Sequence, residues 1–359
     1  MKKNKTIAYV LGTKAQFIKT KFVLKNFIEN GYEILIIDTG QHREITSKEL
    51  QKFGQELNYY NLASNQANVS SIPGMIYWFF KIALISKVKI ENNNLEYCII
   101  HGDTVSTLIG LIFAKRNNLK TFHIEAGHRS KNWLKPFPEE IIRSVVTKYS
   151  NIIAIDDEKL IKNLSYNTKQ KIISLKRNTI YDTLIDNIKD VKILKNNDLT
   201  VTIHRTENIY NKKKLKSFVD LLVLISKSNN FENIKWYCHD ITMKKLVKHK
   251  YDQILYKFDI KLKDLIPHDK FVEVLINSKA VITDGGSIAE ECFIMNQNTV
   301  IWRDIVENKE YLNDNVILSN YEQSAVINFF ENLSITYPEV TKNYSPSKDL
   351  VTQFLAIDS

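Results

Sequence analysis

Short apolar runs alternate along the chain with stretches in which apolar residues recur at helical spacing. In the first half, runs of strand length lie at 6–11, 33–38, 97–101, 120–124 and 151–154. Helical spacing separates them, most clearly over 16–30 and 106–117. Strands that are apolar throughout and separated by helices are typical of parallel sheet covered on both faces. The first half therefore predicts such a sheet.

The pattern begins again after 173–182, a segment that we interpret as a hinge. Further runs of strand length lie at 199–203, 234–239, 280–283 and 299–302. Two such halves in series predict an α/β protein made of two Rossmann-like domains that face a central cleft. The predicted boundaries are 1–173 for the N-terminal domain, 174–335 for the C-terminal domain and 336–359 for a C-terminal tail or helix.

Ionisable or small polar residues follow six of these strands directly. The loops begin at Gly12, Thr39, Gly102, Glu125, His204 and Asp284. Ligands of parallel sheets bind at the carboxyl ends of the strands, where such loops meet. A structural protein has no need of this chemistry in six places, so the sequence predicts a ligand site at this edge of the sheets.

The loop Asp284-Gly285-Gly286-Ser287 lies between a predicted strand and a predicted helix. Small residues let backbone N–H groups approach an anion, and the helix N-terminus adds a favourable dipole. A glutamate further along that helix could accept hydrogen bonds from a ribose. An ordinary tight turn with a capping Asp or Ser is the structural alternative. The loop is neither a P-loop nor a G-x-G-x-x-G fingerprint, which argues against an ATPase and an NAD-dependent dehydrogenase.

Three carboxylates are candidates for acid and base chemistry. Asp103 and Glu125 follow strands, and Glu139 lies in the first turn of a helix that two prolines introduce. Carboxylates that face one cleft can divide acid and base work when their surroundings separate their pKa values. The structural alternatives are loop hydrogen bonds for Asp103 and Glu125, and helix capping for Glu139.

Basic residues offer candidate contacts to an anion. His204 and Arg205 share one loop and could contact a diphosphate leaving group as donor and counter-charge. Lys14, Lys19 and Arg143 are further candidates, although each could also be a solvated surface charge. His101 ends a buried strand, and we expect it to be a packed, hydrogen-bonded histidine rather than a catalytic one.

Composition disfavours several other classes of protein. The formal net charge is +10, but the basic residues are scattered, and the run 212–216 is expected to be a solvated helix start. The sequence thus lacks the long basic stripe of a nucleic-acid-binding protein. It contains no H-x-x-x-H or H-E-x-x-H pair, so we expect no metal and no cofactor.

Two further expectations concern the surroundings of the protein. Its cysteines, Cys98, Cys238 and Cys292, lie far apart in the sequence, which is typical of a reducing cytoplasm. The most apolar segment, 72–85, contains Pro73, Gly74 and Lys81 and is shorter than the ~20 residues that span a bilayer. We therefore expect an amphipathic helix packed on a sheet and no membrane insertion.

Nine stretches, taken together, resemble the UDP-N-acetylglucosamine 2-epimerase family in order and spacing over nearly the whole chain. They are Gly12-Thr13 with Lys19, Thr39-Gly40-Gln41-His42-Arg43-Glu44, His101-Gly102-Asp103-Thr104, Glu125-Ala126-Gly127 with Arg129, Pro138-Glu139-Glu140 with Arg143, Asn178-Thr179-Ile180 with Asp182, His204-Arg205 with Glu207-Asn208, the Asp284 loop with Glu290-Glu291, and Arg303-Asp304. Nine stretches in one order indicate homology far more strongly than any one of them.

The resemblance implies a fold of the glycosyltransferase-B (GT-B) type, with the last helix crossing back to the first domain, and a homodimer. It also implies inversion at C2 of a UDP-linked N-acetyl sugar, as a step of surface-polysaccharide precursor synthesis. In such enzymes the anomeric C–O bond breaks first, which expels UDP and leaves a 2-acetamidoglucal. UDP or water then adds back at C1. Positive charge that develops at C1 loosens the C2 proton, as in the transition states of glycosidases.

The same resemblance implies roles for individual residues. Asp103, Glu125 and Glu139 match the acid and base carboxylates, and His204 matches the group that assists the leaving phosphate. Glu291 matches the residue that binds the ribose. Substrate contacts are implied for Lys14, Lys19, Gln41, Arg143, Arg205, Gly285, Gly286, Ser287, Glu291 and Arg303.

Some loops depart from the family pattern. Lys14-Ala15-Gln16 stands where the family has Arg-Pro-Glu, and Gly285-Gly286-Ser287 stands where it has Ser-Gly-Gly. Arg177 replaces a hinge glycine, and 305–310 lacks the family's Thr-Glu-Arg-Pro-Glu pattern. Two alternatives therefore stay open: a glycosyltransferase of the same fold with a changed donor, and a nucleotide-sugar-binding homologue without turnover.

Overall fold

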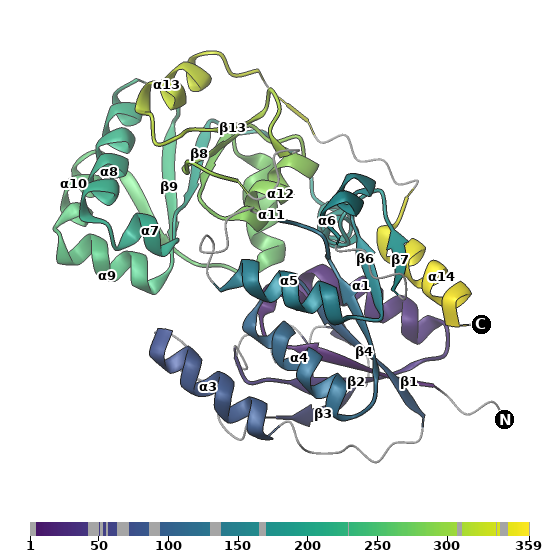
Figure 1. The fold of residues 1–359 in the computed structure, drawn as a ribbon. Helices are drawn as coiled ribbons and strands as arrows, with labels where there is room; N and C mark the ends of the chain where they lie inside the picture. The colour runs from purple at the N-terminus through teal and green to yellow at the C-terminus, as the bar shows by residue number, and fades with distance from the viewer. Residues whose placement is uncertain are drawn as a thin grey trace. The chain divides into compact units, whose positions relative to one another are not determined.

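Two parallel β-sheets organise the chain, one in each half (Figure 1). The computed structural model describes residues 5–41, 50, 53–54, 57–62, 72–85, 94–129, 138–164, 170–228, 230–306, 311–334, 336–337 and 344–358. It divides into an N-terminal unit, 1–183 with 343–359, and a C-terminal unit, 184–342. The first division falls after Thr183 rather than after residue 173, and the second after Lys342 rather than after residue 335.

The N-terminal unit contains a seven-stranded sheet of order β3-β2-β1-β4-β5-β6-β7, whose strand pairs are parallel. Its strands are β1 (Thr6–Leu11), β2 (Glu33–Asp38), β3 (Asn58–Asn61), β4 (Leu95–His101), β5 (Lys120–Ile124), β6 (Ile152–Ile155) and β7 (Lys171–Ser174). The strand order reverses between β1 and β4. Open α/β sheets bind their ligands outside the carboxyl ends of the strands at such a reversal.

Alternate residues of β1 face two different cores. Tyr9 and Leu11 pack in the core that includes Phe354, and Ala8 and Val10 pack in the core that includes Trp78. The helices of this part are α1 (Lys14–Glu29), α3 (Ile72–Ile85), α4 (Val105–Arg116), α5 (Glu139–Tyr149), the 3₁₀ helix η1 (Glu158–Asn163) and α14 (Pro346–Asp358). The helix α6 (Ile180–Ile188) spans the division after Thr183. The sheet is thus buried on both faces, as its apolar strands predict.

The C-terminal unit contains a six-stranded sheet of order β10-β9-β8-β11-β12-β13. Its strands are β8 (Asp198–Thr202), β9 (Asn233–Cys238), β10 (Ile260–Asp264), β11 (Ala280–Thr283), β12 (Thr299–Ile301) and β13 (Val316–Leu318). Its other helices are α7 (Thr206–Ile209), α8 (Lys212–Lys227), α9 (Asp240–Lys248), α10 (Tyr251–Lys257), α11 (His268–Asn277), α12 (Gly286–Ile294) and α13 (Gln323–Glu331). Trp236, Phe218 and Trp302 are the large side chains of its core.

The predicted central strands are confirmed, with ends that shift by one or two residues, whereas four strands were not predicted. All four, β3, β7, β10 and β13, lie at the edges of the two sheets. Edge strands are short and partly exposed, so the apolar run that marks a central strand is short or interrupted in them. The polar β3 is an example, since three of its four residues are exposed. Within 173–182, the segment interpreted as a hinge, β7 ends and α6 begins, and the division between the two units falls directly after it, at Thr183.

The helices predicted over 16–30 and 106–117 are confirmed as α1 and α4, with ends that shift by one or two residues, and two further predicted helices are confirmed as well. The segment 72–85 forms α3, whose Trp78 and Ile82 are buried in the core beside the sheet. The lysine run 212–216 opens α8, where the side chain of Asn211 caps the first turn. Within the described part of the chain, no helix is long and apolar enough to cross a membrane.

The last helix, α14, is fixed to the N-terminal unit by an aromatic cluster. The ring of Phe354 lies 4.9 Å from Tyr97, 5.1 Å from Phe27 and 5.3 Å from Phe122, measured between centroids. At the end of the helix, Asp358 accepts hydrogen bonds from Tyr32, Tyr97 and Lys5. The chain terminus therefore completes the core that covers one face of the sheet.

Truncation of the central ring should destabilise the N-terminal unit. We expect Phe354→Ala to lower the free energy of unfolding by about 3–5 kcal/mol, because the cavity it leaves is walled by other rings. Denaturant unfolding measures the change. Thr352→Ala, an exposed position on the same helix, should alter the free energy by no more than about 0.5 kcal/mol. Equal effects of the two substitutions would contradict this account of α14.

Candidate active site

Polar side chains gather at the carboxyl ends of the strands in each unit. In the N-terminal unit we define the Glu125 cluster as Lys19, His101, Glu125, Asp156 and Asn178. They come from α1, the end of β4, the residue after β5, the residue after β6 and the turn before α6. Because β4, β5 and β6 are parallel neighbours, their ends bring these residues together.

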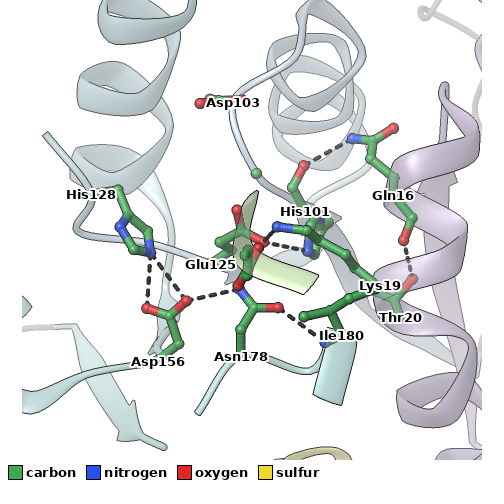
Figure 2. Close-up of polar contacts among 12 residues, drawn as sticks. Gln16, Lys19, Thr20, His101, Asp103, Glu125, His128, Asp156, Asn178 and Ile180 are labelled. Atoms are coloured by element: carbon green, nitrogen blue, oxygen red, sulfur yellow. Dashed lines mark hydrogen bonds and ion pairs between the residues drawn. The ribbon is translucent and has the colours of Figure 1, made fainter. Parts of the chain in front are cut away.

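The carboxylate of Glu125 is held through one of its two oxygens (Figure 2). Oε2 accepts hydrogen bonds from Lys19 Nζ at 2.8 Å and from Asn178 Nδ2 at 3.1 Å. His101 Nε2 lies 3.1 Å from the same oxygen. Among the described residues, Oε1 has no hydrogen-bond partner. One oxygen is thus anchored, and the other is left for a ligand.

The backbone of Glu125 is also unusual. Its φ is +65°, in the left-handed region that residues other than glycine seldom adopt. The neighbouring Ala126 N–H donates to the Ala154 carbonyl on β6, which holds the turn against the sheet. Strained backbone of this kind persists only where the surroundings enforce it, and it concentrates at functional sites.

Glu125 is ionised at neutral pH. Burial raises the pKa of its carboxyl, but the charges of Lys19 and His101 and the contact with His101 lower it further, so the pKa lies well below its usual range. An ionised carboxylate with one unpartnered oxygen can accept a proton. His101 is buried, as expected, and faces Glu125.

Asp103 belongs to a second ionic chain, at the turn between β4 and α4. It forms an ion pair with Arg143 Nη2, and Arg143 Nη1 donates to Glu140 Oε2 at 3.2 Å. Arg129 Nε donates to Glu140 Oε1 at 2.6 Å. Glu140 is only 1% exposed, so the buried carboxylate of this helix is Glu140, whereas Glu139 is partly buried in the first turn. Arg143 thereby fixes Asp103, and the two carboxylates of Asp103 and Glu140 together balance the two guanidinium charges.

Two buried side chains shape the loops around these carboxylates. Gln16 Oε1 accepts from the Gly12 and Thr13 N–H groups, and its Nε2 donates to the His101 carbonyl at 2.8 Å. His123 Nε2 donates to the Gly102 carbonyl at 2.8 Å, and burial lowers its pKa to about 4, so this imidazole is neutral. Neither role could be predicted from the sequence, because both depend on partners that are distant in the chain.

A buried ion pair lies next to Glu125. His128 Nε2 is 2.8 Å from Asp156 Oδ1 and 3.1 Å from Asp156 Oδ2. Burial alone would lower the pKa of His128, but the charge of Asp156 and its hydrogen bond raise it to about 9. His128 is therefore protonated at neutral pH.

In the C-terminal unit, Asp284 organises the loop that carries His204. Asp284 is fully buried and accepts the N–H groups of His204, at 3.0 Å, and Arg205, at 2.9 Å. It also accepts from Asn208 Nδ2 at 2.8 Å, and His204 Nδ1 lies 3.2 Å from it. The ring of His204 is thus positioned through Nδ1, which leaves Nε2 for a ligand.

The remaining candidates of this unit lie in the loop after β8, in α12 and its N-cap, and after β12. Arg205 and Arg303 each lie 3.9 Å from the carboxylate of Glu207. Glu291 is buried, and its Oε1 is 2.9 Å from His268 Nε2. Gly285 N–H donates to Thr283, Gly286 begins α12, and Ser287 is exposed in the first turn.

Other predicted site residues lie in the N-terminal unit. Lys14 is partly buried in the first turn of α1, and Gln41 Oε1 accepts from Ser106 Oγ at 2.5 Å. Residues 42–44, 136–137 and 307–310 were part of the predicted loops but lie outside the described residues. In the part of the chain that the structure describes, no group of three or more His, Cys, Asp or Glu is placed to hold a metal ion.

The two Rossmann-like units and their parallel sheets define an α/β protein of the GT-B fold class, and solved structures of this fold align with almost the whole chain. The UDP-N-acetylglucosamine 2-epimerase from Neisseria meningitidis, bound to UDP-N-acetylglucosamine, aligns with a TM-score of 0.81 at 22% identity, covering 98% of this chain and 100% of that one. The enzyme from Methanocaldococcus jannaschii, in complex with UDP-N-acetylglucosamine and UDP, aligns with a TM-score of 0.80 at 23% identity, covering 98% and 99%. At this level of identity the alignments establish the fold.

The sequence establishes the family. The UDP-N-acetylglucosamine 2-epimerase family model matches residues 27–351, and the chain belongs to that family. A UDP-N-acetylglucosamine 2-epimerase of Salmonella borreze is 26% identical over 329 residues, covering 85% of this chain and 83% of that protein. One from Methanococcus maripaludis is 28% identical over 350 residues, covering 91% of each. The resemblance found in the nine stretches is thus confirmed.

The ion pair of His128 and Asp156 predicts a pH-dependent stability. Folding raises the pKa of His128 from 6.5 to about 9, so the pair stabilises the fold fully below pH 6.5 and loses this effect as the pH rises through 9. The shift corresponds to about 3 kcal/mol. Denaturant unfolding from pH 6.5 to 9 should show this loss in the wild type.

His128→Gln supplies the comparison, because glutamine does not titrate. Its free energy of unfolding should change less over this pH range than that of the wild type. Asp156→Asn should likewise reduce the change in the free energy of unfolding over this pH range, since it removes the charge that raises the pKa of His128. A variant that keeps the full pH dependence of the wild type would show that the pair does not cause it.

Proposed function

We propose that the protein is an epimerase that acts on UDP-N-acetylglucosamine or a related UDP-linked 2-acetamido sugar. The observation that carries the proposal is the state of Glu125: ionised, anchored through Oε2 and unpartnered at Oε1 among the described residues. Such a group suits proton transfer at a sugar carbon. Relatives with named UDP-N-acetylglucosamine 2-epimerase activity support the choice of substrate.

The chemistry that we propose begins with cleavage of the anomeric C–O bond. UDP leaves with the bonding electron pair, positive charge develops at C1, and a carboxylate takes the proton from C2, so that a C1–C2 double bond forms. UDP or water then adds at C1, and C2 receives a proton on the opposite face. Inversion requires groups that serve both faces, and Asp103, Glu125 and Glu139 are the carboxylates we assign to this work.

We assign the UDP contacts chiefly to the C-terminal unit. His204, positioned through Nδ1 by Asp284, would donate from Nε2 to the leaving phosphate. Glu291 would accept from the ribose. The backbone at the start of α12 favours an anion. Further contacts to the UDP-sugar are proposed for Lys14, Lys19, Gln41, Arg143, Arg205, Gly285, Gly286, Ser287 and Arg303.

The family supports three wider proposals. The product would serve as a precursor of surface polysaccharide, because that is the use of such sugars implied by the resemblance. We also propose a homodimer on the same ground. A cytoplasmic location is supported by three buried free cysteines, Cys98, Cys238 and Cys292.

Exchange at C2 in heavy water tests the chemistry. With UDP-N-acetylglucosamine or a diacetamido analogue, NMR should show deuterium at C2 together with the 2-epimer or free UDP. Glu125→Gln should slow this exchange about 10²- to 10⁴-fold, because glutamine cannot accept the proton. Calorimetry should show that the variant still binds UDP, since the proposed UDP contacts lie chiefly in the other unit.

Glu96→Gln is the matched control. Glu96 is an exposed carboxylate near the start of β4, paired with Lys120 and remote from the strand ends that form the site. The Glu96→Gln variant should catalyse C2 exchange at the wild-type rate. If the Glu125→Gln variant also catalysed it at that rate, the assigned chemistry would be wrong. UDP release that depends on an added saccharide, without C2 exchange, would instead support a glycosyltransferase.

A further inference from the structure

Asn178 bridges two carboxylates (Figure 2). Its Nδ2 donates to Glu125 Oε2 at 3.1 Å and to Asp156 Oδ2 at 2.8 Å. Its Oδ1 accepts from the Ile180 N–H at 3.0 Å, and the residue is only 8% exposed. An amide nitrogen has two hydrogens, so both are used and the third bond fixes which way the amide faces.

Asp156 can occupy this position because His128 balances its charge. Both side chains are about nine-tenths buried, and the imidazole contacts both carboxylate oxygens. Without that partner, Asp156 would be a buried anion one amide away from Glu125, and the two like charges would repel each other. The pair therefore supplies Asn178 with a fixed acceptor while adding no net charge beside Glu125.

We propose that Asp156, paired with His128, is a positioning residue for Glu125 and acts through the amide of Asn178. The amide supplies one of the nitrogens that anchor Oε2, so that Oε1 stays directed to the proton it transfers. The inference rests on the proposed function for its catalytic consequence. Its structural part, the coupling of Asp156 to Glu125 through one amide, can be measured without turnover.

The consequence for pH follows from the loss of a donor. A carboxylate that loses a hydrogen-bond donor becomes easier to protonate, so its pKa rises. The acidic limb of the kcat profile should then move to higher pH. The charged or titratable groups that face this network are Lys19, His101, His123, Glu125, His128, Arg143 and Asp156.

A double-mutant cycle tests the route of the coupling in the full chain. We expect Asn178→Ala and Asp156→Ala each to lower kcat for UDP release about 10- to 100-fold with little change in KM. The double variant should be no slower than the slower single variant, because Asp156 acts only through Asn178. Effects that multiply would show two independent roles and overturn the proposal. Asp156→Asn keeps an acceptor oxygen and should recover most of kcat.

A spectroscopic readout separates this proposal from the proposed function. Carbon-13 NMR of the Glu125 carboxyl, assigned through Glu125→Gln, follows its titration whether or not the sugar turns over. Asn178→Ala should raise its pKa, because it removes a donor to Oε2. Joint replacement of His128 and Asp156 by leucine should raise it as well, because the amide of Asn178 then loses the acceptor that holds it and no unbalanced charge is left. An unchanged titration in either would overturn the coupling. Absence of C2 exchange in a wild type with the expected titration would refute the proposed function alone.

Two further variants control for the possibility that the substitutions act by destabilising the fold. His128→Leu/Asp156→Leu replaces the buried pair with apolar side chains, a change that is often neutral or stabilising, and it should lower kcat as Asp156→Ala does. Asn151→Ala removes an amide at the other end of β6, where it accepts from the Thr121 N–H. It should leave kcat and the Glu125 titration unchanged. A loss of kcat in Asn151→Ala equal to that in Asn178→Ala would assign the effect to stability and overturn the proposal.

Discussion

The site in the N-terminal unit depends on one constraint, the need to keep a partly buried carboxylate ionised. Removing an anion from water is costly unless donors and opposite charges surround it. Glu125 finds them in Lys19 on α1, His101 at the end of β4 and Asn178 in the turn before α6. Glu125 follows β5, which pairs with β4, so His101 and Glu125 meet at neighbouring strand ends. The strand order is thus a condition of this arrangement.

A second carboxylate shows what separates a structural anion from a reactive one. Asp284 in the C-terminal unit is fully buried, and both of its oxygens are engaged by the loop that carries His204. It therefore has nothing left to offer a ligand and serves to position the imidazole. Glu125 keeps one oxygen unpartnered among the described residues, and this difference, rather than the residue type, is the reason that we propose Glu125 for the chemistry.

The sequence predicted those features that depend on a local pattern of residues, such as apolar strands and the polar residues that directly follow them. Central strands were found because both of their faces are apolar, and edge strands such as β3 were missed because theirs are not. Glu125 was found because it directly follows a strand. Asn178 appeared in a motif but received no role, and Asp156 was not noticed. Their roles depend on a contact between the ends of different strands, which no spacing within one segment reveals.

The same reasoning explains two departures from the family pattern. At position 16 the family has glutamate, but here the side chain must donate as well as accept: it binds two backbone N–H groups and the His101 carbonyl at once. A glutamate could not donate to that carbonyl, so glutamine fits this network.

Gly285 stands where the family has serine. A Cβ there would lie 3.0 Å from His204 Cε1, a contact that would require the imidazole to shift by a few tenths of an ångström. Glycine leaves the ring where Asp284 positions it. These two departures are thus each matched by their neighbours, Gln16 by the backbone groups that it binds and Gly285 by the ring of His204. This matching favours the proposed epimerase over a nucleotide-sugar-binding homologue without turnover, because a site that has lost its function is not constrained to preserve such contacts.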